Sequence, residues 1–241
     1  MDDMSKLAAP LLLPAVLSVI AGSADVISFL GLDGLFNAHI TGNLVIIAAH
    51  MVAGQAANIA LLLSVPIFVL VLALTSLLAV WLERAGIASL QPLLLMQFLL
   101  LAGFLALCGA DGSPMNLNVA SAIAAGLLGV SAMAVQNALV QISLKGAPTT
   151  AVITTTVTRL TVDAVHVLVN RRAADVTTAR RRMKRSWPAI IGFTAGAGLG
   201  AAGFAAYGLW SLVLPTSLAL VAFLIGVGGK LGLCSRETNE G

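Results

Sequence analysis

The sequence predicts an all-α fold, a polytopic transmembrane helical bundle with six spans, two short or broken helices and a two-fold internal repeat. Hydrophobic residues make up 59% of the 241 residues, and the mean hydropathy is +1.01. Only 10% of the residues are charged, against about 25% in soluble domains. Polar breaks divide the chain into eight apolar segments, so eight full spans are the alternative arrangement.

The first half of the chain contains four of these segments. Residues 11–32 are long enough to cross a hydrocarbon core of about 30 Å and contain one acid, Asp25. A polar break separates them from residues 44–54, which are too few to span and are therefore predicted as a half-helix. Two long apolar segments, 59–81 and 92–110, complete the half.

The second half repeats this order of elements. Long apolar segments cover residues 119–144, 187–207 and 209–231, and a Thr-rich segment, 149–170, occupies the place of the first half's short one. Residues 171–186 hold seven of the chain's 13 basic residues. Because basic residues gather in cytoplasmic loops of membrane proteins, this stretch is predicted to be a basic cytoplasmic loop.

The repeat predicts one transmembrane domain, 1–241, built from halves at about 10–110 and 118–232. If the short segments return to the side from which they enter, most basic residues fall on one side of the bilayer. The halves then have opposite orientation, as in many secondary transporters with broken helices. This arrangement predicts a bacterial inner (cytoplasmic) membrane protein with both termini in the cytoplasm.

Candidate binding residues lie in and beside the two short segments. Thr and Asn side chains can cap a helix start, where unpaired N–H groups attract anions and carbonyls. A carboxylate in a span persists where it faces a cavity or a partner, so Asp25 is a candidate coupling or substrate-binding group. The predicted substrate- or ion-binding residues are Asp25, His39, Thr41, Gly42, Asn43, Gln136, Asn137, Thr154, Thr155, Thr156, Arg159 and Asp163.

Structural roles are open for the same residues. Asp25 could bond a neighbouring helix, for example through Asn137 or Arg159. Arg159, Asp163 and His166 lie at i, i+4 and i+7 on one helical face, where Arg159 and Asp163 could neutralise each other at the cytoplasmic interface. The alternative is that Arg159 binds an anion while the other two relay protons.

A stripe of glycines, Gly192, Gly196 and Gly200, predicts close helix packing, either inside the bundle or at a dimer seam. No hydrolase, zinc-protease or phosphate-loop motif is found. We therefore expect no enzyme activity, no catalytic residues, no metal site and no cofactor. The expected partners are the lipid bilayer and a small-molecule or ion substrate, with no nucleic acid, and a homodimer is left open.

Residues 21–29 followed by 39–43 form one motif, and residues 136–138 followed by 154–156 form a second. Both motifs resemble the YoaK family of bacterial membrane proteins, a domain of unknown function. The sequence departs from the family pattern at Ile40, where Met is usual, and at Thr155, where Gly is expected. The resemblance implies a multi-pass inner-membrane protein of about six spans and supplies no activity.

These observations favour a secondary transporter or permease for a small polar or anionic solute. One alternative is a non-transporting membrane scaffold or regulator, in which the basic stretch binds anionic lipid or a cytosolic partner. An intramembrane enzyme or a channel is the third interpretation.

Overall fold

The structure is a computed structural model that describes residues 2–55, 58–111, 120–144, 153–169 and 173–237. Every regular element in these residues is a helix, which confirms the predicted all-α class. The helices are α1 (Asp2–Gly31), α2 (Ile40–Val52), α3 (Ile59–Arg84), α4 (Leu90–Asp111), α5 (Ala120–Ser143), α6 (Ile153–Val169), α7 (Ala173–Tyr207), the 3-10 turn η2 (Gly208–Leu212) and α8 (Val213–Glu237).

The length and the apolar composition of its helices indicate that this chain is a membrane protein. Helices satisfy their own backbone hydrogen bonds, as a segment surrounded by lipid requires. Five stretches of the described chain are long and apolar enough to cross a membrane, and the last of them runs through α7, η2 and α8. The five stretches are Leu12–Gly31, Ile59–Arg84, Leu90–Gly109, Ala120–Ser143 and Val176–Val227.

After α1 the chain runs through α2 and then returns, so that α3 begins close to the end of α1. Two successive residues with positive φ, Asp33 (46°) and Gly34 (85°), end α1 and reverse the chain. Asn58, just before α3, donates a hydrogen bond from Nδ2 to Asp33 Oδ2 at 2.6 Å. The end of α1 and the start of α3 therefore lie at the same end of the bundle. With 13 residues, α2 is about 20 Å long, less than the hydrocarbon thickness.

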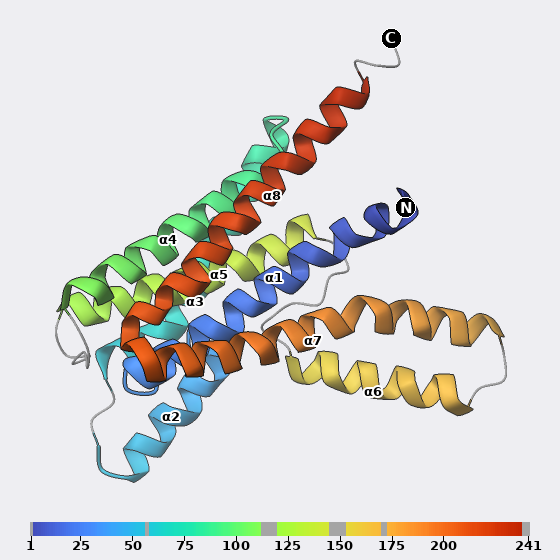
Figure 1. Cartoon of the computed structure of the whole chain (residues 1–241). Helices are drawn as coiled ribbons and strands as arrows, with labels where there is room; N and C mark the ends of the chain where they lie inside the picture. Colours follow the sequence, from blue (N-terminus) through green and yellow to red (C-terminus); the bar gives the residue numbers. More distant parts are fainter. Residues whose placement is uncertain (1, 56–57, 112–119, 145–152, 170–172, 238–241) are drawn as a thin grey trace.

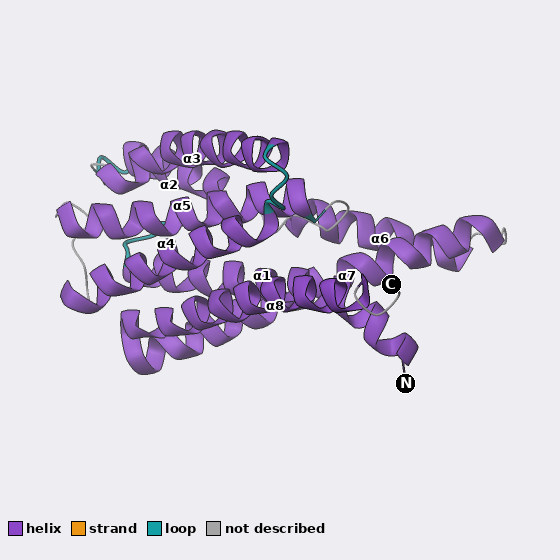
Figure 2. Ribbon diagram, turned by 90° about the horizontal axis from the view of Figure 1, so that it is seen from above, coloured by secondary structure: helices purple, strands orange, loops and turns teal. Residues whose placement is uncertain are grey.

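The long helices form one bundle (Figures 1 and 2). Helix α5 runs through its centre, packed against α3 and α4, while α1 packs against α7 and α8. Helix α4 also packs against α8, and the short helices α2 and α6 pack against α3 and α7 respectively. Helices α1 and α5 run in opposite directions (Figure 1).

The predicted glycine stripe makes the contact between α1 and α7. A Cβ atom added at Gly192 would lie 2.7 Å from the carbonyl oxygen of Ala15, and one at Gly200 would lie 2.9 Å from Ser23 Cα. Between them, Gly196 meets the Val19 carbonyl in the same way. The stripe therefore packs two helices of the same chain together, which is one of the two uses predicted from the sequence.

The basic stretch differs from the loop predicted for residues 171–186. From Ala173 onward it is the first part of α7, while Arg171 and Arg172 lie outside the described residues. Charge predicts which side of a membrane a segment occupies but not its conformation. Residues 173–186 contain no Gly or Pro and are rich in the helix formers Ala, Arg, Met and Lys. With α6 they form a hairpin that extends beyond one end of the bundle (Figure 2).

Candidate functional site

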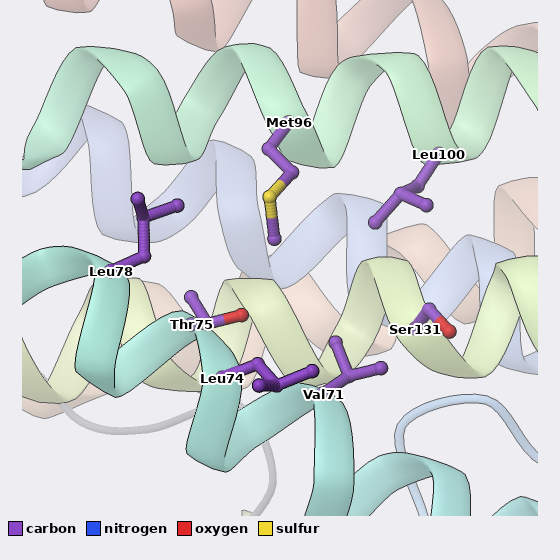
Figure 3. Close-up of a pocket in the computed structure, with 7 residues that line it drawn as sticks. All are labelled: Val71, Leu74, Thr75, Leu78, Met96, Leu100 and Ser131. Carbon is purple, nitrogen blue, oxygen red and sulfur yellow. The ribbon is translucent and has the colours of Figure 1, made fainter.

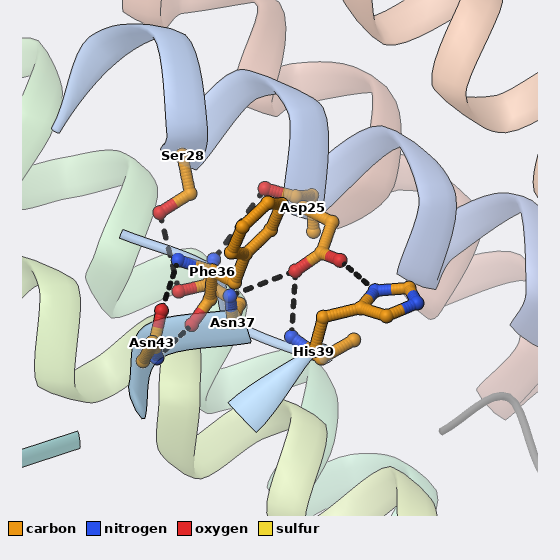
Figure 4. Close-up of polar contacts among 8 residues, drawn as sticks. Asp25, Ser28, Phe36, Asn37, His39 and Asn43 are labelled. Atoms are coloured by element: carbon orange, nitrogen blue, oxygen red, sulfur yellow. Dashed lines mark hydrogen bonds and ion pairs between the residues drawn. The ribbon is translucent and has the colours of Figure 1, made fainter. Parts of the chain in front are cut away.

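The connection between α1 and α2 folds back against the middle of the bundle and is held there by Asp25. This carboxylate is only 2% exposed. Its Oδ1 accepts hydrogen bonds from the backbone N–H groups of Asn37, at 2.8 Å, and Ala38, at 2.7 Å. Its Oδ2 contacts His39 Nδ1 (Figure 4). A buried acid thus satisfies main-chain donors in a segment without regular structure.

His39 forms the outer edge of this network. Its side chain is 34% exposed, in contrast to that of Asp25. The imidazole ring contacts Phe36 and Phe193 edge-on, with ring centroids 5.9 Å and 5.3 Å away. Because Phe193 belongs to α7, His39 connects the buried carboxylate to the helix that packs against α1.

Asn43 holds the connection from the other side. Its Oδ1 accepts the Phe36 N–H at 2.8 Å, and its Nδ2 donates to the Phe36 carbonyl at 2.8 Å. The same Nδ2 donates to Ser64 Oγ in α3 at 3.0 Å. This amide side chain therefore pairs with the main chain as a neighbouring backbone would, and it joins α2, the connection and α3.

Asn37 was not among the predicted site residues, yet it completes the network. Its Oδ1 accepts a hydrogen bond from Ser28 Oγ at 3.2 Å, and its Nδ2 lies 3.5 Å from the Ala24 carbonyl oxygen. Its amide also rests on Gly129 of α5, where a Cβ atom would lie within 3 Å of it. The sequence signal for Asn37 was its place in the polar break, from which only residues 39 and 41–43 were chosen as candidates.

Thr41 and Asn43 do not cap α2 as predicted. The helix begins at Ile40 with His39 at its N-cap, and this cap position makes no side-chain hydrogen bond to the helix. Thr41 is exposed and Asn43 is buried in the first turn. Gly42 is required by space, because a Cβ atom there would lie 2.8 Å from the Phe36 ring.

Gln136 and Asn137 lie in the buried part of α5. Gln136 Nε2 donates to the Leu17 carbonyl of α1 at 3.0 Å, and its Oε1 accepts from Gln97 Nε2 of α4 at 2.7 Å. Asn137 Nδ2 donates to the Met133 carbonyl at 2.9 Å, while its Oδ1 is buried without a partner among the described residues. Asp25 thus bonds the connection and not Asn137 or Arg159, the two partners considered from the sequence.

The α6 residues form a second, separate cluster. Asp163 is buried and accepts two hydrogen bonds from Arg182 of α7, from Nη2 at 2.8 Å and Nε at 3.2 Å. Its partner is therefore Arg182 and not Arg159, because helix pairing brings α7 against this face of α6. A cavity of about 410 Å³ is lined by Thr158, Arg159, Val162, Asp163, His166 and Arg182.

The predicted residues thus divide among three places. Asp25, His39 and Asn43 meet at the α1–α2 connection, Gln136 and Asn137 lie in α5, and Arg159 and Asp163 lie on the α6–α7 hairpin. Thr154 and Thr155 are exposed on α6, and Thr156 is buried there. Helix α2, which begins beside Thr41, packs against α3, whereas helix α6, which begins beside Thr154, packs against α7.

Long apolar helices around a buried polar junction define a multi-pass α-helical membrane protein. Residues 13–225 match the model of a family described as protein of unknown function (DUF1275), and the chain belongs to that family. The match includes both motifs that carried the resemblance in the sequence. No curated protein and no solved structure matches the chain.

Proposed function

We propose that this protein is a secondary transporter or permease for a small polar or anionic solute, in a bacterial cytoplasmic membrane, and that it works without enzymatic chemistry or a bound cofactor. The observation that carries the proposal is the bonding of Asp25. A buried carboxylate is costly in a membrane and is retained where it does work or has partners. Here its partners are backbone N–H groups of the connection between α1 and α2, so the charge of Asp25 helps to hold that connection in position.

The coupling step follows from this bonding. Ionised Asp25 accepts two charge-assisted hydrogen bonds from the connection and faces His39. Hydrogen bonds to charged groups contribute about 1.5–3 kcal/mol each, more than neutral ones. Protonation of the carboxylate weakens all three contacts at once. Arrival of a proton or cation at Asp25 would then free the connection and, through Phe193, loosen its contact with α7.

The pairing of the helices supports an inverted repeat. In the proposed repeat, the helices α1, α2, α3 and α4 correspond to α5, α6, α7 and α8 in that order. Replacing each helix by its counterpart turns the contact between α1 and α7 into the contact between α5 and α3, and the contact between α4 and α5 into that between α8 and α1. The pair α2–α3 becomes α6–α7, while α4–α8 and α1–α5 are unchanged. All of these contacts are present, and α1 and α5 run in opposite directions (Figure 1). Inverted halves of this kind are the usual basis of alternating access.

Asn137 is the proposed counterpart of Asp25 in the second half. Its Oδ1 is buried and without a partner among the described residues, and in this proposal it accepts a hydrogen bond from the solute once a conformational change opens a path to it. The two halves would then divide the work, with the charged junction coupling ions and the neutral amide binding solute.

The proposal is tested with purified protein in liposomes that contain a pH-sensitive dye. Panels of carboxylates, amino acids, sugars and phosphate are added outside, and lumenal acidification reports proton-linked uptake. We expect one solute class to acidify the parent vesicles. Asp25→Asn should reduce that rate at least tenfold, because an amide cannot exchange the proton.

Asp33→Asn is the matched control, since Asp33 is an exposed acid just after the same helix, and Asn keeps an acceptor for Asn58 and tolerates the positive φ of this turn. It should keep most of the parent rate. Equal uptake by Asp25→Asn and the parent would remove Asp25 from the mechanism, and no uptake of any solute by the parent would contradict transport itself.

One observation favours a second function, that of a scaffold or regulator at the membrane surface. Helix α6 exposes Val162, Val165 and Leu168, and the adjoining part of α7 exposes Arg180 and Arg181. An apolar stripe beside basic residues suits anionic lipid or an acidic cytosolic partner. In that case, replacing both arginines by Gln would abolish function while Asp25→Asn would not.

A further inference from the structure

A lipid-facing groove lies between α3, α4 and α5 (Figure 3), and its lining includes none of the residues that bond Asp25 or Asn43. Its volume is about 350 Å³. Leu74, at its rim, is 55% exposed on the outside of the bundle, so the groove opens sideways toward the bilayer. Its lining consists of Val71, Leu74, Thr75, Leu78, Met96, Leu100 and Ser131.

Thr75 gives this groove an unpaired hydrogen-bonding group. The residue is 1% exposed, and its Oγ1 has no hydrogen-bond partner among the described residues. Hydroxyls in helices usually bond the carbonyl one turn back. Ser76 does so to Leu72 at 2.8 Å, and Ser131 to Leu127 at 2.6 Å. The Thr75 hydroxyl instead points into the groove (Figure 3).

The other occupants of an apolar groove fit less well. Water needs two to four polar partners, and most of this lining is aliphatic. A hydrocarbon chain would fill the space but would leave the buried hydroxyl unpaired, which costs free energy in a dry site. A molecule with an apolar body and one hydrogen-bond acceptor satisfies both the shape and the hydroxyl.

We propose that this groove is a binding site for a bilayer-dissolved aliphatic molecule with a carbonyl oxygen, which accepts a hydrogen bond from the Thr75 hydroxyl. The ligand enters from the lipid side past Leu74. The site goes beyond the proposed transport of a polar solute, because it is lined by different residues and selects a different chemistry.

The test is photolabelling of the full-length protein in lipid nanodiscs with a diazirine derivative of 2-decanone. Label should map to peptides from α3, α4 and α5. Unlabelled 2-decanone and decane then compete. In Thr75→Val, which keeps the shape and removes the hydroxyl, 2-decanone should compete about three- to tenfold more weakly than in the parent, and decane should be unchanged.

Ser76→Ala is the matched control, because its hydroxyl is already bonded to the helix, and it should leave both competitors unchanged. Thr75→Ser keeps the donor and should retain the ketone preference. Ser131→Phe should fill the groove and abolish labelling. Equal competition by 2-decanone in the parent and in Thr75→Val would overturn the proposal, as would equal weakening of the ketone and decane or labelling that Ser131→Phe does not reduce.

Discussion

Single side chains hold an irregular segment of main chain inside the bundle. Asp25 accepts two backbone N–H groups, and Asn43 pairs with both polar groups of Phe36. In lipid, an unpaired backbone group costs several kcal/mol, so a break between helices is tolerated only where the protein supplies partners. These two side chains supply them, and that is why a break can exist here.

Removing Asn43 should therefore destabilise the fold. In Asn43→Ala, the N–H and carbonyl groups of Phe36 lose their partner in a buried setting, and each loss costs about 1–3 kcal/mol. We expect the free energy of unfolding to fall by about 3 kcal/mol. The measurement is the melting temperature of the purified variant in detergent, followed by intrinsic fluorescence.

Thr41→Ala is the control in the same helical turn, since Thr41 is exposed. Its melting temperature should stay close to the parent value. If the two variants melt alike, Asn43 does not hold the connection.

Sequence reasoning identified the acid but not what it binds. A carboxylate within an apolar segment stands out by its cost, so Asp25 could be chosen from the sequence alone. Its partners are main-chain N–H groups at residues 37 and 38, whose positions depend on the turn at Asp33 and Gly34. No residue type marks such donors, and side-chain partners such as Asn137 were considered instead.

At the scale of one helix, spacing predicted packing well and charge predicted conformation poorly. Glycines four residues apart must lie on one face, and the structure places a helix against that face. The basic run, predicted as a cytoplasmic loop, is helical from Ala173 onward, and its cytoplasmic location stays a prediction, because the positive-inside rule concerns location alone. The Asp163–Arg182 pair joins two helices, so periodicity within α6 could not reveal it.

The α1–α7 contact gives the prediction for this scale. A methyl group at Gly196 would meet the backbone of Val19 in α1, and backbone cannot move aside as a side chain can. Gly196→Ala should therefore lower the free energy of unfolding by about 1–3 kcal/mol. Thermal unfolding of the purified protein measures the change.

Gly198 lies on the exposed face of the same helix, where an added Cβ atom meets nothing within 4 Å. Gly198→Ala should raise stability by about 0.5–1 kcal/mol, because alanine is the better helix former. If Gly198→Ala destabilised the protein as much as Gly196→Ala, the substitutions would change the stability of α7 itself and not its contact with α1.

For the whole molecule, the internal repeat stays a prediction: the order of elements in the sequence suggested it, and the pairing of the helices is compatible with it. The number of spans stays a prediction. This number depends on whether α2 crosses the membrane. The hydrogen bond between Asn58 and Asp33 joins the residues just after α1 and just before α3, on either side of α2 in the sequence. Residues on opposite sides of a bilayer could not bond at 2.6 Å.

The sidedness of α3 tests this inverted arrangement most directly. Gln55→Cys and Ala85→Cys are made singly in a chain whose two cysteines, Cys108 and Cys234, are replaced by serine. Intact cells are then treated with a membrane-impermeant maleimide. We predict labelling at position 55 and protection at position 85 until the membrane is permeabilised. Ser5→Cys, before the first span, reports the side of the N-terminus. Labelling at 85 with protection at both 5 and 55 would mean that α2 crosses the bilayer, and it would contradict the inverted halves on which the transport proposal depends.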